Sequence, residues 1–155
     1  MKHLLVFLPI VLVACEAILP SNAMDDVSVS NSKTISFPCD DKSVQTTEWV
    51  YCDPVEFDLS GYPVKNIVMY FSLRVAPQNT DKVIAELYDL NNDSTIPLSQ
   101  VESVISYVQH TRTTPDLSDF LARGHQKLAI RFRVNRDGAV GFISTGSRLV
   151  VKYKD

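Results

Sequence analysis

Apolar and polar residues alternate with a period of two through most of the chain beyond residue 33. The clearest runs are residues 67–75, 128–134 and 149–153, in which every second side chain is apolar and polar or charged residues occupy many of the positions between. Successive side chains of a strand point to opposite faces, so this pattern predicts β-strands with one buried and one solvated face. A chain with this pattern is expected to fold as layers of sheet.

The segments between these runs indicate how the strands pair. Parallel strands need crossover connections of a dozen or more residues, usually helical, and the sequence has no regular series of them. Alternation of this kind is typical of antiparallel sheets with one solvated face. We therefore expect an all-β domain over residues 34–155, an antiparallel β-sandwich that is jelly-roll-like, preceded by a linker over residues 24–33.

Two segments depart from the strand pattern. Residues 116–121 are predicted to form one short helix, because Asp116 is a suitable N-cap and Gly124 a suitable terminator. Between residues 98 and 108 the apolar residues have helical spacing, yet β-branched residues are frequent there. For that second segment, helix and strand both stay open.

Residues 1–23 have the layout of an export signal. A positively charged start precedes an apolar run over residues 4–14, which is too short for the roughly 20 residues that span a bilayer. Two cleavage sites compete. Residues 12–15 resemble a bacterial lipobox, which would make Cys15 the lipidated first residue, whereas residues 21–23 suit ordinary signal peptidase.

Cys39 and Cys52 stand 13 residues apart beyond this signal. An exported chain reaches a compartment that permits disulfides, and the chain-entropy model gives a loop of this size about 3 kcal/mol of stabilisation. The other interpretation is a zinc site, but His110 and His125 have neither the spacing nor the neighbours of zinc ligands. We predict a structural disulfide and no metal site.

Charge is unevenly distributed along the chain. Residues 25–58 contain eight acidic residues and two lysines, a local net charge of −6. Residues 123–154 contain eight basic residues and one aspartate, a local net charge of +7. If the two basic strands in this second region share a sheet, their outward residues form a basic surface for an anionic ligand. The alternative is that the basic strands pair with the acidic ones and form cross-strand ion pairs.

The candidate ligand-binding residues follow from that alternation. The basic ones lie at outward positions of the two strands, and Trp49 is added because sugar rings stack on aromatic faces; an alternative is that Trp49 is buried beside the disulfide. The candidates are Trp49, Lys127, Arg131, Arg133, Arg148 and Lys152.

Other classes of function have little support. The 15 basic and 18 acidic residues argue against a nucleic-acid-binding protein, and the five glycines do not cluster into a phosphate-binding loop. A nucleophile needs a nearby base, and only two histidines remain beyond the signal, one beside a glycine and one in a threonine-rich loop. This argues against catalysis, and no cofactor is expected. Residues 89–93 have the D-x-N-x-D spacing of a calcium loop, but Ser94 and Gln100 stand where Gly and Glu would follow, which predicts a polar hairpin turn.

The order of segments resembles one family. Residues 55–59 followed by 67–75 are similar to the "rFdLs … a-x-L-x-L-x-V" passage of DNRLRE-type carbohydrate-binding modules. Residues 116–121 resemble their "D-V-T-x-x-V" element, and their closing strands resemble residues 128–132, 141–145 and 148–153. The resemblance implies an exported, non-catalytic jelly-roll module that binds polysaccharides, acidic ones among them.

Together these features predict an exported binding module, secreted or held in the cell envelope by a lipid on Cys15. Its expected partner is a polysaccharide or another anionic cell-surface ligand, with the membrane reached only through that lipid. The alternative is a structural or protein-interaction subunit of a cell-envelope or secreted complex.

Overall fold

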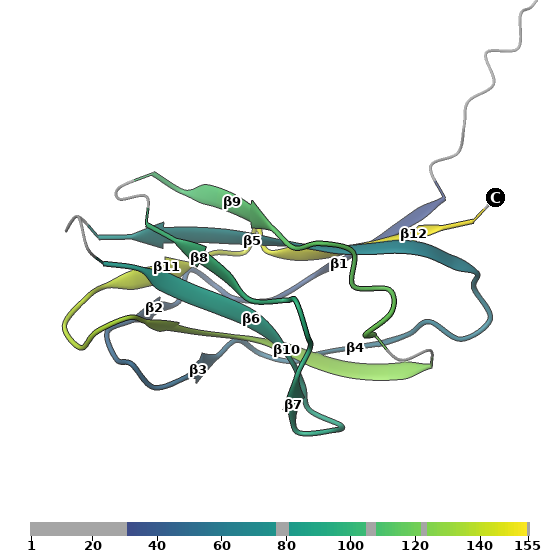
Figure 1. Ribbon diagram of the computed structural model, residues 1–155, viewed down its shortest axis with the longest axis horizontal. Helices are drawn as coiled ribbons and strands as arrows, with labels where there is room; N and C mark the ends of the chain where they lie inside the picture. The colour runs from purple at the N-terminus through teal and green to yellow at the C-terminus, as the bar shows by residue number, and fades with distance from the viewer. Residues whose placement is uncertain (1–30, 77–80, 105–107, 122–123, 155) are drawn as a thin grey trace, which may run out of the picture.

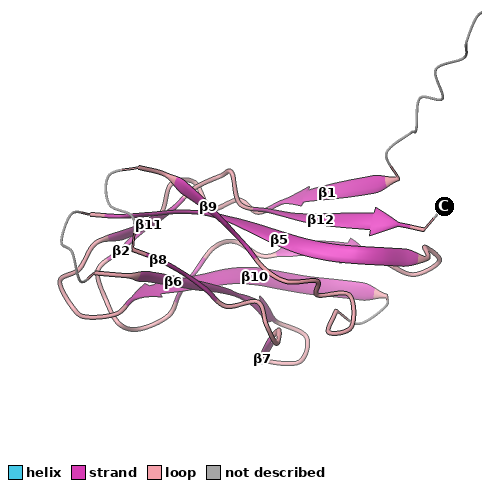
Figure 2. Cartoon of the chain, turned by 45° about the horizontal axis from the view of Figure 1, so that its top comes forward, coloured by secondary structure: helices cyan, strands magenta, loops and turns pink. Residues whose placement is uncertain are grey.

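A computed structural model describes residues 31–76, 81–104, 108–121 and 124–154. The expected export signal, the lipidation site Cys15 and most of the linker therefore lie outside the described residues. Within the described part, the chain forms twelve strands and no helix (Figures 1 and 2). The strands are β1 (Ser32–Ser36), β2 (Ser43–Val44), β3 (Val50–Tyr51), β4 (Val55–Asp58), β5 (Val64–Val75), β6 (Val83–Asp89), β7 (Ser94–Thr95), β8 (Val101–Ser103), β9 (His110–Thr113), β10 (His125–Val134), β11 (Gly141–Ile143) and β12 (Arg148–Tyr153).

The described strands form two six-stranded antiparallel sheets that pack face to face, as the two layers in Figure 2 show. In the first, called the β5 sheet, the order is β1-β12-β5-β11-β2, and β9 pairs with the other edge of β5. In the second, called the β10 sheet, the order is β3-β10-β6-β7, with β4 paired to β10 and β8 to β6. The expected antiparallel, jelly-roll-like β-sandwich is confirmed.

The inward faces of both sheets form one apolar core. The alternation of residues 67–75 is confirmed, because every second side chain from Ile67 to Val75 is 1% exposed or less. The inward side chains of β10, from Leu128 to Val134, are equally buried. Burial of aliphatic and aromatic side chains between the two layers is the main force that holds the sandwich together.

The short helix expected over residues 116–121 is wrong: the segment forms a single turn in which the amides of Phe120 and Leu121 donate to the Leu117 carbonyl. Its hydrogen bonds go instead to β5, where the Leu117 amide donates to the Ile67 carbonyl and the Asp116 carboxylate accepts from the Ile67 amide. Leu117 and Leu121 are buried in the core. A single turn gains little from helix formation, so bonding to an open strand edge and core burial decide its conformation.

Low pH is expected to weaken the hydrogen bond by which the Asp116 carboxylate attaches this turn to β5. Burial alone would raise the pKa of Asp116, but hydrogen bonds from the amides of Ile67 and Ser118 hold it below its ordinary value. Because the folded-state pKa is depressed, the stabilisation is present above the unfolded-state pKa and is lost as the pH falls through the folded-state pKa. We expect Asp116→Ala to cost about 1 kcal/mol near neutral pH and less in acid. Urea denaturation from about pH 7 to about pH 2 measures this, and an equal cost at every pH would contradict it.

Candidate functional site

The predicted basic residues do not lie on one surface. Arg131 and Arg133 project from β10, whereas Arg148 and Lys152 project from β12. Because β10 and β12 belong to different sheets, their outward faces lie on opposite sides of the sandwich. The two basic strands do not share a sheet, so the condition for one basic surface is not met and each sheet is considered separately.

On the β10 sheet, Lys127 and Arg131 meet acidic partners, whereas Arg133 donates to the Thr47 carbonyl. β4 pairs with β10 and places Glu56 opposite Lys127, whose ammonium lies 2.9 Å from the carboxylate. That hydrogen bond and the lysine's charge lower the pKa of Glu56. On the neighbouring strand β6, Glu86 lies opposite Arg131 and accepts from its guanidinium at 2.7 Å. The alternative predicted from the sequence, cross-strand ion pairs between basic and acidic strands, is confirmed for Lys127 and Arg131 of β10.

Trp49 lies within this paired region and is half-buried. The guanidinium carbons of Arg131 and Arg133 lie 4.6 and 4.7 Å from its ring centroid. Arg131 also lies 4.1 Å from the ring centroid of Tyr88 and donates to the Tyr51 hydroxyl. Cation–π contacts therefore occupy the rings on which a sugar could stack, and most of the hydrogen-bonding capacity of Arg131 is used within the protein.

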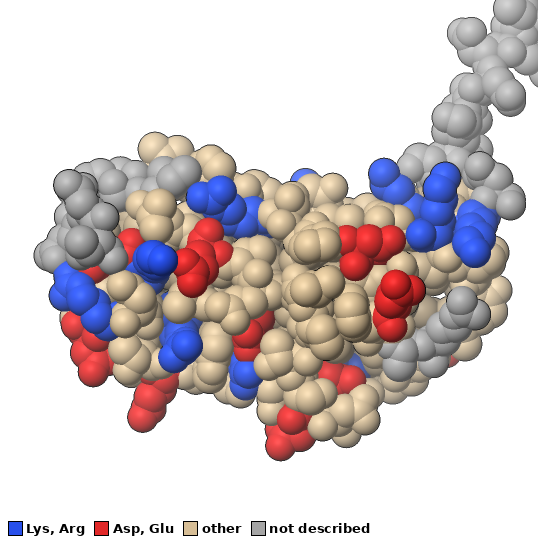
Figure 3. Space-filling model, viewed as in Figure 1, with Lys and Arg blue, Asp and Glu red and all other residues tan. Residues whose placement is uncertain are grey.

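The β5 sheet has a different charge distribution. The six strands that the structure describes in it contain six basic residues and no aspartate or glutamate. The six described strands of the β10 sheet contain five acidic and three basic residues. Figure 3 shows basic side chains gathered where β1 begins and β12 ends, and charges of both signs over the rest of that view. Among the described strands, the excess of basic over acidic residues therefore lies on the β5 sheet.

Two of these cations project outward beside aromatic rings, and a third lies on the same face. The strand register places Arg148 opposite Tyr70 and Arg74 opposite Phe142, and the guanidinium carbons lie 5.0 and 4.3 Å from the ring centroids. Lys152 lies further along β12 on the same outward face and is exposed. Among the described residues, these cations have no carboxylate partner within 4.0 Å. The β5-sheet basic face is defined here by Tyr70, Arg74, Phe142, Arg148 and Lys152.

The sequence interpretation included Arg148 and Lys152 but missed Arg74 and Phe142. Arg74 could have been found, because it alternates with the buried residues of β5 and therefore points outward. The pairing of Arg74 with Phe142 could not have been predicted from the sequence, because β5 and β11 are more than 60 residues apart and only the tertiary structure pairs them.

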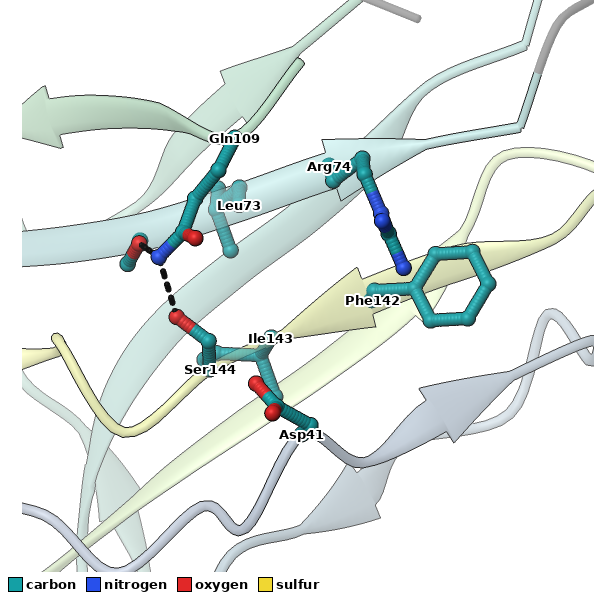
Figure 4. A pocket seen from close by; sticks show the side chains of 8 residues that line it. Asp41, Leu73, Arg74, Gln109, Phe142, Ile143 and Ser144 are labelled. Carbon is teal, nitrogen blue, oxygen red and sulfur yellow. Dashed lines mark hydrogen bonds between the residues drawn. The ribbon is translucent and has the colours of Figure 1, made fainter. Parts of the chain in front are cut away.

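A pocket of about 190 Å³ lies at one end of this face (Figure 4). Its polar wall includes Gln109, whose side-chain amide donates to the hydroxyls of Ser72 and Ser144. The remaining lining is mixed in character: Asp41, Leu73, Arg74, Phe142 and Ile143. A pocket that combines hydroxyl, amide, carboxylate and guanidinium groups with an aromatic ring can bind a small polar molecule.

The pocket carboxylate comes from a tight turn after the disulfide. The Lys42 amide donates to the Cys39 carbonyl at 2.9 Å, which closes a four-residue turn with Asp40 and Asp41 in its centre. Both aspartates have positive φ, 33° and 49°. The predicted disulfide between Cys39 and Cys52 is formed and buried, and it links this turn to the residue after β3.

The described residues form no cluster of three His, Cys, Asp or Glu side chains suited to a metal ion. Residues 89–93 form the predicted polar hairpin turn between β6 and β7, in which the Asp89 carboxylate accepts from the amides of Asn91 and Asn92. In the same described part of the chain, no helix has the length and apolar character needed to cross a membrane.

Comparison with known proteins finds similarity of fold. No protein-family model matches the chain, and no curated protein matches its sequence. The VP2 subviral particle of infectious bursal disease virus is 13% identical, with a TM-score of 0.53 over 79% of this chain and 32% of that one. TmCBM61, solved in complex with β-1,4-galactotriose, is 13% identical, with a TM-score of 0.39 over 81% of this chain and 90% of that one. Dimeric latent PorU from Porphyromonas gingivalis is 12% identical, with a TM-score of 0.44 over 81% of this chain and 13% of the PorU chain.

The chain therefore spans about a third of the VP2 chain that it matches. At these sequence identities the similarity shows the fold alone, since one sandwich architecture supports many unrelated functions. The protein is an antiparallel β-sandwich, similar in fold to the part of the VP2 chain that it matches.

Proposed function

We propose that this protein is an exported, non-catalytic binding module and that the β5-sheet basic face binds an acidic polysaccharide or another anionic cell-surface ligand. The observation that carries the proposal is the charge of the β5 sheet, whose described strands contain six basic residues and no acidic ones. Cations without acidic partners keep their electrostatic attraction for an external anion, whereas internally paired cations have largely lost it.

The make-up of the face favours a sugar ligand. Tyr70 and Phe142 are each in a cation–π contact with one arginine, Arg148 and Arg74 respectively. Two arginines contact the ring of Trp49, so the β5-sheet basic face keeps more aromatic surface beside its positive charge. Acidic polysaccharides present both ring faces and carboxylate or sulfate groups, and arginine binds such groups through two parallel hydrogen bonds. The resemblance of the segment order to DNRLRE-type carbohydrate-binding modules supports the same ligand class.

Export is part of the proposal. The disulfide between Cys39 and Cys52 supports a location in an oxidising compartment outside the cytoplasm. Whether the module is secreted or held by a lipid on Cys15 depends on the signal peptidase that acts on residues 1–23. The intact mass of the exported protein distinguishes the two, because lipidation adds acyl chains to Cys15.

The binding face can be tested with matched charge variants. We expect the exported protein to bind alginate, polygalacturonate or heparin more weakly at high salt, because salt screens exposed charges. The double variant Arg148→Gln/Lys152→Gln should weaken this binding at least tenfold, about 1.4 kcal/mol. Isothermal titration calorimetry at two salt concentrations measures both effects.

Lys82→Gln is the control, because Lys82 pairs with Glu102 and lies on the β10 sheet side. This variant should bind the polysaccharide as the parent protein does. An equal loss of polysaccharide affinity in the control and the double variant would contradict a binding site localised on the β5 sheet. Binding that neither salt nor the double variant changes would exclude the basic face as the site.

A second candidate function, a protein-interaction subunit of a cell-envelope or secreted complex, is favoured by one observation. Val104 and Val108 are 51% and 62% exposed, and they flank the connection between β8 and β9. Each of these strands pairs with one described strand only, so exposed apolar residues adjoin open sheet edges, where a partner strand can add. Size-exclusion chromatography over a range of concentrations would reveal self-association, and no polysaccharide binding at all would favour this candidate.

A further inference from the structure

The pocket at the end of the β5-sheet basic face contains two opposite charges that do not pair. Asp41 and Arg74 both line it, but no ion pair within 4.0 Å joins them. Among the described residues the Asp41 carboxylate accepts no hydrogen bond, and the Arg74 guanidinium makes a cation–π contact with Phe142 but no hydrogen bond or ion pair. In Figure 4 Asp41 and Arg74 come from different sides of the pocket, and the Asp41 carboxylate points toward Ser144. The pocket thus offers a strong acceptor and a strong donor to a guest.

The presence of both charges determines which net charge of a ligand the pocket favours. An anion would bind Arg74 but be repelled by Asp41, and an ammonium group would be repelled by Arg74. Hydroxyl groups satisfy both, because each can donate to a carboxylate and accept from a guanidinium. The hydroxyls of Ser72 and Ser144 and the amide of Gln109 extend the same polar wall. The chemistry therefore favours a neutral molecule that has several hydroxyl groups.

The size of the pocket and its apolar surface further restrict the class of ligand that it can bind. Its volume of about 190 Å³ is below the 300–1,000 Å³ typical of drug-sized ligands. The ring of Phe142 supplies the apolar surface beside the polar groups, because the side chains of Leu73 and Ile143 are buried in the core. A single sugar ring matches this arrangement, because its C–H faces are apolar and its edge has hydroxyl groups.

The turn that holds Asp41 is built at a conformational cost. Two consecutive residues with positive φ form a turn of the type that favours Asn-Gly, and here both positions are aspartate. The turn is fixed to β11 by a hydrogen bond from the Ile143 amide to the Lys42 carbonyl, 3.0 Å long. Strained residues of this kind are concentrated at functional sites, where the surrounding structure compensates for their cost.

We propose that this pocket is a subsite for one neutral pyranose unit of a polysaccharide whose acidic units lie along the β5-sheet basic face. The inference rests on the proposed function, since it identifies the ligand as an acidic polysaccharide that also contains neutral sugars. Tyr70 and Arg74 are four residues apart on β5, about 13 Å at the usual rise per residue, so a short oligosaccharide reaches from the pocket to Arg148.

The test is an NMR titration of the isotopically labelled exported protein with single sugars. Glucose, galactose, mannose and N-acetylglucosamine are the neutral probes, and galacturonate and glucosamine are their charged counterparts. We expect at least one neutral sugar to shift the signals of the Gln109 side chain and the Ser144 amide, at concentrations up to about 100 mM, enough to detect a millimolar Kd. The charged counterparts should bind at least tenfold more weakly.

Two variants of the same turn identify the group responsible. Asp41→Asn should weaken sugar binding at least tenfold, whereas Asp40→Asn should not, because Asp40 does not line the pocket. Asp41→Gly is a further check, because glycine accepts positive φ without strain and preserves the turn. Loss of sugar binding in a folded Asp41→Gly protein supports a direct role of the carboxylate.

The outcomes separate this inference from the proposed function. Salt-sensitive polysaccharide binding without any neutral-sugar shift at the pocket would overturn the subsite and leave the proposed function intact. Pocket shifts without polysaccharide binding would support a sugar site and overturn the basic face. Binding of galacturonate as tight as that of every neutral sugar, or unchanged binding in Asp41→Asn, would overturn the subsite.

Discussion

Replacing Glu86 with alanine is expected to lower the free energy of unfolding by about 3–5 kcal/mol, the cost of breaking a buried ion pair. The side chains of Glu86 and Arg131 are 5% and 15% exposed, and their charged atoms are 2.5 Å apart. Removing the carboxylate leaves the guanidinium poorly solvated and without its acidic partner. Thr95 loses an acceptor too, because its hydroxyl donates to Glu86. Urea denaturation at neutral pH measures the change.

A double variant distinguishes the unpaired charge from lost packing. Glu86→Leu/Arg131→Met replaces the pair with apolar side chains of similar size, and such replacements are often neutral or stabilising. We expect it to recover most of the stability lost in Glu86→Ala. A loss below about 1 kcal/mol in the single variant would show that the pair is solvated well enough to tolerate breakage.

Removing the disulfide is expected to cost about 3 kcal/mol, because the loop between the two cysteines gains conformational freedom in the unfolded state. Cys39 and Cys52 are both buried, so the double variant Cys39→Ala/Cys52→Ala also leaves a small gap in the core. Chemical denaturation of the double variant, compared with the parent protein before and after reduction by dithiothreitol, measures the effect.

The same variant links stability to the pocket. Cys39 begins the turn that holds Asp41, and the Cys39 carbonyl closes that turn by accepting from the Lys42 amide. Without the covalent link, the turn should lose order and neutral-sugar shifts at Gln109 should weaken. A destabilisation below about 1 kcal/mol on reduction would contradict the structural role predicted for this bridge.

Much of the fold follows from short-range patterns in the sequence. Alternation identified β5, β10 and β12 and the faces that each strand buries, because side-chain direction in a strand depends only on residue parity. The cysteine spacing and the expected export context predicted the disulfide between Cys39 and Cys52. The helix over residues 116–121 was wrong because its local signals are weaker than the hydrogen bonds that Asp116 and Leu117 make to Ile67, a strand residue about 50 positions away.

The candidate site shows the same division between sequence and structure. The sequence by itself determined that Arg131, Arg133, Arg148 and Lys152 point outward, because parity fixes the face of each strand. Only the tertiary structure decided that β10 pairs with acid-bearing strands, while β12 pairs with β1 and β5, which have no acidic residue. Strand pairing joins segments distant in the sequence and depends on the packing of the whole core, so local periodicity cannot specify which basic residues keep their charge unpaired.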